Sequence, residues 1–290
     1  AALRVWSRLL ESERSGPNVS FTTGDRSKCK TAGMIRLTFM MRRRPNETRA
    51  EFQRYWLEQH GPLMASFATD LNVLRYVQCH TTEDDHSKLW GRRGEMEAPY
   101  DGVAEVWWES VAALNKTLGS AAGRAAGAAL VADELNFVDL ATSPLWLNYE
   151  YPQVNSTPED LVASDRSSLV KLYFPLRHLS SLTFDEAQAY WRTHHGPIIR
   201  RQAAGSGVKR YIQVHRAEHE LSELMGRARS TEVEPYTGHA ELWIDRNEMG
   251  LVTPERRTSS RRAHADESTF IDFERSTMFL CKEHVLIDKR

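Results

Sequence analysis

The chain has 290 residues, a length that suits one large domain or two small ones. Hydrophobic residues make up 41% and charged residues 27%, so a sizeable core is expected and extensive disorder is excluded. The formal net charge of −1 provides no general attraction to nucleic acid or anionic lipid, and neither is expected as a partner.

Cofactor, metal and membrane motifs are missing from the sequence. Cys29, Cys79 and Cys281 are widely spaced and show no CxxC or Cys/His pattern, so neither a disulfide framework nor a zinc site is predicted. This cysteine usage favours a reducing, cytoplasmic location. No stretch approaches the roughly 18 uninterrupted apolar residues of a membrane-spanning helix. No Walker loop, GxGxxG or HExxH is present, so no bound cofactor is expected.

An internal repeat organises the chain, because the second half matches the first at a shift of about 135 residues. The matching segments are 55–62 with 190–197, 75–80 with 210–215, 102–107 with 238–243, and 133–134 with 266–267. A nearly constant register over this length indicates a duplicated unit.

The repeat defines the predicted domains. The first copy spans residues 34–151 and the second spans 168–290. Between them, residues 152–167 are rich in Pro, Ser and Asp and poor in apolar residues, as linkers are. Residues 1–33 belong to neither copy and are interpreted as an N-terminal extension.

Within each copy the hydrophobic periodicity predicts the order β-α-β-β-α-β. Residues 34–41 alternate between apolar and polar side chains, as a half-buried strand does. Thr48 and Glu51 form a capping box that opens a helix, which is expected to end at Gly61-Pro62. Strands at 73–80, 103–108 and 145–149 and a helix within 110–134 follow. The second copy repeats the capping box with Thr183 and Glu186.

Such a unit is ferredoxin-like, with one antiparallel sheet and two helices on one face. The other sheet face needs a cover. Two copies in one chain satisfy this need by packing sheet to sheet, so we expect an α+β pseudo-dimeric barrel with its helices outside. A small-molecule cavity is expected between the sheets of this monomer, which is also compatible with a homodimer.

Strand parity predicts which side chains face the barrel interior. On the first and third strands these are Arg36, Thr38, Met40, Val103, Glu105, Trp107, and in the second copy Lys171, Tyr173, Pro175, His239, Glu241, Trp243. On the second strand, Val77, Cys79, Ile212 and Val214 suit the helix side. That assignment turns Tyr76, Gln78, His80, Tyr211, Gln213 and His215 inward.

The Trp-x-x-x-His-Gly-Pro segment at 56–62 and 191–197, together with Arg75-Tyr76 and Asp101-Gly102, resembles the EthD-type family of the dimeric α+β barrel superfamily. The resemblance implies a barrel that acts on hydrophobic, often aromatic or polyketide-derived, small molecules. Relatives include cofactor-independent decarboxylases and cyclases. More distant superfamily members are quinone-forming monooxygenases and haem enzymes.

Several residues are candidates for the chemistry. His60 and His195 suit acid–base catalysis, although a role in capping the helix end is the alternative. His239 and Glu241 lie two residues apart on one strand face and form a possible catalytic pair, and His215 is a further candidate base. Tyr211 is a candidate donor to an oxyanion. The predicted substrate-binding residues are Tyr76, Gln78, His80, Glu105, Trp107, Tyr173, Gln213 and Trp243.

The resulting hypothesis is a cofactor-independent enzyme that decarboxylates or cyclises an aromatic or polyketide-type molecule in secondary metabolism. Two alternatives stay open: an oxidoreductase of the same superfamily, with or without haem, and a non-catalytic binding protein. Which of the two repeats carries the working site is also left open. The long connections at 81–99 and 216–235 are predicted to be lids over the barrel ends.

Overall fold

The computed structural model describes residues 33–157 and 160–290. The predicted N-terminal extension, up to residue 32, lies outside the described residues. The elements of the first repeat are β1 (Ile35–Met41), α2 (Arg49–Tyr55), η2 (Trp56–His60), α3 (Gly61–Ser66), β2 (Arg75–Thr81), α4 (Ser87–Trp90), η3 (Gly91–Arg93), β3 (Gly102–Trp108), α5 (Val111–Gly119), α6 (Ala121–Glu134) and β4 (Leu145–Asn155).

The second repeat has the same core order. Its elements are β5 (Leu169–His178), α7 (Phe184–Tyr190), η4 (Trp191–His195), α8 (Gly196–Ser206), β6 (Val208–Arg216), α9 (Glu220–Arg229), β7 (Gly238–Asp245), η5 (Arg246–Glu248), α10 (Pro254–Glu267), β8 (Ile271–Asp272) and β9 (Phe279–Asp288).

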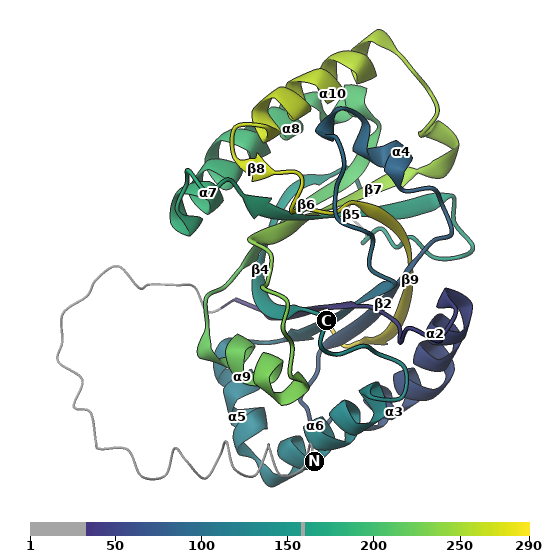
Figure 1. The fold of residues 1–290 in the computed structure, drawn as a ribbon, viewed down its shortest axis with the longest axis vertical. Helices are drawn as coiled ribbons and strands as arrows, with labels where there is room; N and C mark the ends of the chain where they lie inside the picture. The colour runs from purple at the N-terminus through teal and green to yellow at the C-terminus, as the bar shows by residue number, and fades with distance from the viewer. Residues whose placement is uncertain (1–32, 158–159) are drawn as a thin grey trace, which may run out of the picture.

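The strands close into one barrel in the order β7-β6-β4-β1-β3-β2-β9-β5, because β5 also pairs with β7. The last long strand of each repeat joins the two halves. β4 pairs with β1 of its own repeat and with β6 of the other, while β9 pairs with β5 and with β2. The helices lie on two opposite sides of this barrel (Figure 1). The predicted α+β barrel is therefore confirmed.

The first helix of each repeat begins as predicted but does not end at Gly-Pro. Thr48 and Thr183 cap the helices, and each makes the reciprocal bonds of a capping box with the glutamate three residues on. The chain then passes through a π-helical turn, η2 or η4, and continues as α3 or α8. Pro62 is tolerated because it lies in the first turn of α3, after the widened turn. His60 and His195 are thus not helix ends, so the alternative role in capping a helix end does not apply to them.

The expected orientation of the second strand is wrong in both repeats. Val77 and Cys79 belong to the apolar cluster inside the barrel, and Ile212 and Val214 also pack inward. The side chains that were expected inside face the helices instead; they are Tyr76, Gln78 and His80 of β2 and Tyr211, Gln213 and His215 of β6. Every residue of β2 is buried, so its alternation of apolar and polar side chains does not distinguish inside from outside.

Two other segments differ from the expectation. The fourth strand was predicted to end at Tyr149, but β4 continues to Asn155, passing Pro152 at a bulge in its pairing with β6. The small-residue helix within 110–134 is two helices, because Ser120 ends α5 and caps α6 through its side chain.

The two long connections carry short helices that cover the opposite repeat. In Figure 1, α9 of the second repeat lies beside α5 and α6 of the first, and α4 of the first lies beside α10 of the second. Side-chain contacts agree, since Arg229 of α9 binds Glu134 and Arg93 of η3 binds Glu267. The connections therefore lie over the helical sides of the barrel.

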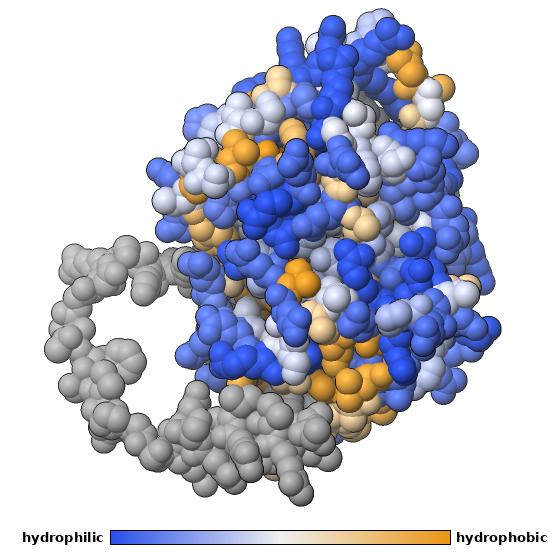
Figure 2. All heavy atoms as spheres, viewed as in Figure 1, coloured by the Kyte–Doolittle hydropathy of each residue, from blue (hydrophilic) through white to orange (hydrophobic). Residues whose placement is uncertain are grey.

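Hydrophilic side chains predominate on the face drawn in Figure 2, and apolar residues gather there only in small groups. The most exposed large apolar side chains among the described residues are Val252 and Leu251. Within the described ranges, no helix has the length and apolar character needed to cross a membrane.

Candidate active site

Oppositely charged side chains pair inside the barrel, where a cavity was expected. Arg36 of β1 contacts Glu105 at 2.6 Å and also binds Glu241, which comes from the other repeat. Lys171 of β5 contacts Glu105 at 2.5 Å and Glu241 at 3.2 Å. All four side chains are about 1% exposed, and buried charges of this kind need such partners. The interior therefore joins the repeats through ion pairs.

The candidate pair His239 and Glu241 belongs to this network. His239 Nε2 lies 3.0 Å from Glu241 Oε1, and the imidazole is fully buried. Burial lowers the pKa of His239 to about 4, against the opposing effect of Glu241. Although burial acts to raise it, Arg36 and Lys171 hold the pKa of Glu241 well below its usual value. A neutral imidazole and a doubly paired carboxylate suit a structural network better than proton transfer.

The other residues predicted to line the interior from these strands do so. Tyr173 stacks on His239, Trp107 donates to Glu150, and Trp243 donates to Glu283 of β9. Their side chains fill the barrel between the ion pairs. Their role in substrate binding stays a prediction.

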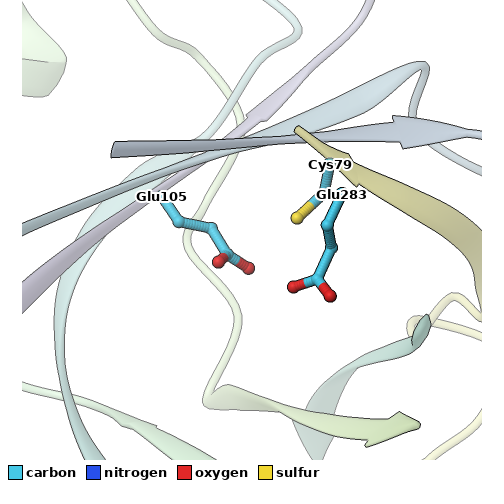
Figure 3. Close-up of side chains that lie close together, drawn as sticks. All are labelled: Cys79, Glu105 and Glu283. Carbon is cyan, nitrogen blue, oxygen red and sulfur yellow. The ribbon is translucent and has the colours of Figure 1, made fainter. Parts of the chain in front are cut away.

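Cys79, Glu105 and Glu283 point toward one another in the interior, as Figure 3 shows, and their ligand atoms lie within 4.8 Å. Lys171 Nζ is 3.3 Å from Glu283 and 3.9 Å from Cys79 Sγ, besides its contact with Glu105. The lysine ammonium thus already supplies the cation that this cluster needs. The cluster is not suited to a metal ion.

The polar residues of β2 and β6 lie on the helix side instead of in the interior. His80 and His215 stack on Trp56 and Trp191 with ring centroids 4.8 and 4.4 Å apart. Burial lowers the pKa of each of these histidines to about 3. Gln78 and Gln213 donate to the main-chain carbonyls of the same two tryptophans. These four residues hold the π-helical turns against the sheet.

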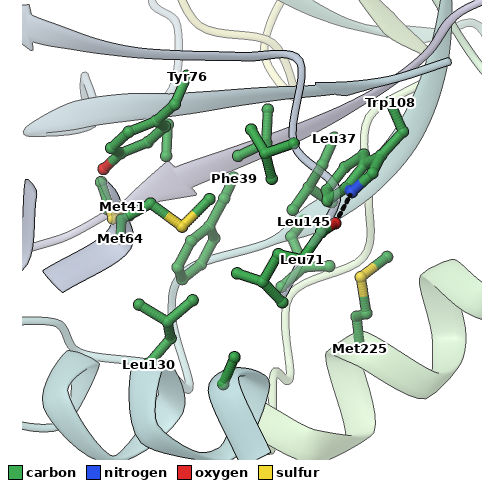
Figure 4. Packing of buried hydrophobic residues seen from close by; sticks show 14 of the residues in the cluster. Leu37, Phe39, Met41, Met64, Leu71, Tyr76, Trp108, Leu130, Leu145 and Met225 are labelled. Atoms are coloured by element: carbon green, nitrogen blue, oxygen red, sulfur yellow. Dashed lines mark hydrogen bonds between the residues drawn. The ribbon is translucent and has the colours of Figure 1, made fainter. Parts of the chain in front are cut away.

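Two cavities lie between the sheet and the helices, one in each repeat. The first pocket lies between β1–β3 and helices α5, α6 and α9, and has a volume of about 100 Å³. Figure 4 shows the apolar side chains that pack there, with Phe39, Met41 and Tyr76 from the sheet facing Leu130 of α6. The second pocket lies between β5–β7 and helices α8 and α10, and has a volume of about 180 Å³.

A histidine held by an aspartate lines each pocket. His60 Nδ1 lies 2.8 Å from Asp133 of α6, and His195 Nδ1 lies 2.7 Å from Asp266 of α10. The hydrogen bond from His60 lowers the pKa of Asp133, so the carboxylate is ionised and accepts the Nδ1 proton. Among the described residues nothing binds Nε2 of either ring. This geometry leaves Nε2 of a pocket-lining imidazole free to act as a base.

The aspartates are anchored by a second matched contact. Tyr55 donates to Asp133 and Tyr190 donates to Asp266, each at 2.8 Å. These aspartates were not expected as site residues from the sequence. The sequence does contain a pattern that points to them, since Asp133-Glu134 and Asp266-Glu267 are one of the matched segments of the repeat.

Tyr76 and Tyr211 also line the pockets. The Tyr76 hydroxyl accepts from Trp56 Nε1 at 2.9 Å and from Gln78 Nε2 at 3.1 Å, and Tyr211 has the same two kinds of donor at 3.2 Å each. Because both contacts use the oxygen as acceptor, the phenolic proton is free to be donated. Burial raises the pKa of Tyr76 and Tyr211, which keeps that proton in place. Each tyrosine can therefore donate to a developing oxyanion.

The glycine of the His-Gly-Pro motif allows this arrangement. A Cβ atom on Gly61 would lie 2.9 Å from Leu286 and 3.1 Å from the Gln78 amide nitrogen. A Cβ on Gly196 would meet Gln153 and, at 3.1 Å, the Gln213 amide nitrogen. Glycine at this position lets the glutamine reach the π-helical turn that presents the histidine.

An arginine from the opposite repeat completes the wall of each pocket. Arg229 of α9 binds Glu134 through two contacts of 2.7 Å, and Arg93 of η3 binds Glu267 at 2.8 and 2.7 Å. The arginines also lie over matched phenylalanines, with Arg229 5.2 Å from the Phe39 ring and Arg93 5.4 Å from the Phe174 ring. Neither repeat therefore builds its pocket alone.

A histidine can serve as the axial ligand of haem, and each of the two pockets has one in its wall. A cavity of about 150 Å³ accommodates a single benzene ring. The pockets, of about 180 and 100 Å³, have no room for a four-pyrrole macrocycle. Neither of these two histidine-lined pockets therefore has the space for haem.

The sequence pattern of the EthD domain matches residues 44–141 and again residues 179–274. The chain therefore belongs to the EthD domain family and carries two tandem copies. Among curated proteins, none matches it.

Among solved structures, an anthrone oxidase-like protein is similar at 9% identity and a TM-score of 0.48, over 90% of this chain and 96% of that one. A variant of chlorite dismutase from Candidatus Nitrospira defluvii is similar at 11% identity and a TM-score of 0.39, over 90% and 96%. Likenesses at these levels do not indicate the reaction, so the chemistry must be inferred from the chain's own residues.

Proposed function

We propose that the chain is a cofactor-independent enzyme that transfers protons to and from a hydrophobic aromatic small molecule. The observation that carries this proposal is an aspartate-held histidine and a tyrosine with a free phenolic proton that line the same apolar pocket. Nothing else in the described part of the chain combines a free imidazole nitrogen, a fixed tautomer and a cavity.

The histidine would remove a proton from a carbon next to a carbonyl, or from a phenol, at Nε2. The resulting negative charge on oxygen would be stabilised by the Tyr211 or Tyr76 hydroxyl. Asp266 or Asp133 would hold the imidazole in the required tautomer and stabilise the imidazolium. The enolate can then close a ring onto a second carbonyl and regain a proton. Run on a β-keto acid, the same site stabilises the enolate that CO₂ loss leaves, and the imidazolium protonates it.

The first test uses 2-tetralone, a two-ring ketone with acidic α-protons, as a probe. The wild-type chain in D₂O is expected to speed exchange of these protons, measured by NMR. His195→Gln is expected to slow the catalysed exchange at least 100-fold, in the range known for general-base catalysis. Tyr211→Phe should slow it about 100-fold, because the oxyanion loses its donor.

His194→Gln is the matched control, because His194 precedes His195 but is exposed. It should leave the exchange rate unchanged. Folded variants at His60, His195, Tyr76 and Tyr211 that all exchange at the wild-type rate would contradict the proposal and favour a binding protein. A Soret band in the purified chain would favour a haem enzyme instead.

A further inference from the structure

The two pockets differ at matched positions of their walls. Both members of each of three pairs line their pockets: Leu71 with Ser206, Gly127 with Ser260, and Leu130 with Ala263. Leucines of the first pocket are thus replaced by a serine and an alanine in the second. These exchanges make the second pocket wider and add hydroxyl groups to it.

The volumes follow from these exchanges. The first pocket, at about 100 Å³, has little more than half the volume of the second, at about 180 Å³. In the first pocket, Met225 of α9 and Leu114 and Leu118 of α5 add further apolar side chains. In the second repeat only the three-residue 3₁₀ helix η5 stands between β7 and α10, in the place of the nine-residue α5.

The polar groups of the two pockets are also satisfied differently. In the first pocket, Thr117 donates to Ala113 and Glu134 is paired with Arg229. In the second pocket, Gln202 donates from its amide nitrogen to Ile198, but its Oε1 is buried and accepts nothing from any described residue. Buried acceptors normally have a donor. Phe67 occupies the corresponding position of the first repeat.

We infer that only the second pocket takes the ligand and that Gln202 selects a ligand carrying a hydroxyl group, which donates to its Oε1. The first pocket serves as a packed scaffold. This inference rests on the proposed function, which identifies these pockets as substrate sites. It adds Gln202 as a specificity-determining residue. It also predicts that His195, and not His60, removes the proton.

The test compares binding of 2-naphthol and 2-methylnaphthalene, which have similar shapes but differ in the hydroxyl donor. Isothermal titration of the full chain should give one site for 2-naphthol. The Kd of 2-naphthol should be on the order of tenfold lower than that of 2-methylnaphthalene. Gln202→Met should remove this preference by weakening 2-naphthol alone. Phe67→Met, at the matched position of the first repeat, should change neither Kd.

Two exchanges between the repeats test the location of the site. Ala263→Leu places the first pocket's side chain in the second pocket and should abolish binding of both probes. Ser206→Leu is a second blocking variant in case the first does not fold, and thermal melting reports folding of both. Leu130→Ala, which enlarges the first pocket, should leave the 2-naphthol preference and its Gln202 dependence intact.

The inference and the proposed function can fail separately. Two bound naphthols, no binding of 2-naphthol to the wild type, or a preference that survives Gln202→Met would overturn the inference. If exchange of 2-tetralone depends on His60 and not on His195, the inference fails while the proposed function stands. If 2-naphthol binds as expected but no histidine variant changes the exchange rate, the proposed function fails and the selective pocket remains.

Discussion

At the scale of single residues, the buried histidines divide into two groups according to what holds them. His60 and His195 each face a carboxylate, and their second nitrogen is left for the pocket. His80, His215 and His239 are buried with glutamine or a doubly paired glutamate as partner, and burial lowers the pKa of each far below neutral. The partner therefore separates the histidines suited to catalysis from those that act in packing.

Glu105 gives a prediction about pH at this scale. Burial raises its pKa to about 7, against the attraction of Arg36 and Lys171. The folded chain then binds this proton more tightly than the unfolded chain. The associated stability is fully present below pH ~4.5 and is lost as the pH rises through 7. Glu105→Gln cannot titrate, so its free energy of unfolding should fall less than that of the wild type between pH 5 and 8.

Between pH 5 and pH 8 the free energy of unfolding of the wild type should fall by about 2.5 kcal/mol more than that of Glu105→Gln. Urea unfolding at pH 5, 6, 7 and 8 measures it. The exposed Glu109→Gln is the control and should follow the wild type at every pH. Parallel curves for Glu105→Gln and the wild type would show that Glu105 does not titrate in this range.

At the scale of elements, the helices of each long connection pack against the opposite repeat. The capping boxes and the first and third strands follow from short sequence patterns that each repeat carries. The packing of α9, α4 and η3 against the opposite repeat does not follow from such patterns. Arg229 of α9, for example, binds Glu134, which lies 95 residues away in the chain. The sequence predicted lids, and the structure places them on the helical sides of the opposite repeats.

Arg229 gives the prediction at this scale. Glu134 is 4% exposed, so removal of its arginine leaves a buried carboxylate without a partner. Arg229→Met should lower the free energy of unfolding by about 3 kcal/mol. Arg227→Met, on the exposed side of the same helix, should change it by less than about 0.5 kcal/mol.

Denaturant unfolding measures both variants. Addition of Glu134→Gln to Arg229→Met should recover part of the loss, because the buried charge is then removed. Equal costs for Arg229→Met and Arg227→Met would mean that the contact between the repeats contributes nothing to stability.

At the scale of the whole molecule, the barrel belongs to both repeats at once. β4 and β9 each pair with a strand of either repeat, and the interior ion pairs join Arg36 and Glu105 to Lys171 and Glu241. The apolar cluster inside the barrel also draws on both halves. One repeat alone would expose strand edges, apolar side chains and unpaired charges together.

The prediction at this scale concerns residues 33–157 expressed alone. This segment should elute as a dimer or aggregate, because only another sheet can cover its inner face. Size-exclusion chromatography with light scattering measures the mass. A monomer that melts cooperatively would contradict the view that the repeats need one another.

The candidate site could be predicted only in part. His60 and His195 followed from the His-Gly-Pro motif, and Tyr211 was named as a proton donor, although it was expected inside the barrel. Asp133 and Asp266 lie 73 and 71 residues from the histidines they hold, so no local pattern connects them. No sequence pattern pointed to Gln202, because only the residues that surround it in the fold decide whether its side-chain oxygen lacks a hydrogen-bond donor.

The sequence by itself determined the duplication, the order of elements and the barrel, because these depend on periodicity and on motifs that recur at one register. The tertiary structure decided which sheet face carries the pockets. Both faces of β2 are buried, one by the opposite sheet and one by helices, so apolarity could not distinguish them. The same packing paired the interior charges and left the helical sides to form two unequal pockets.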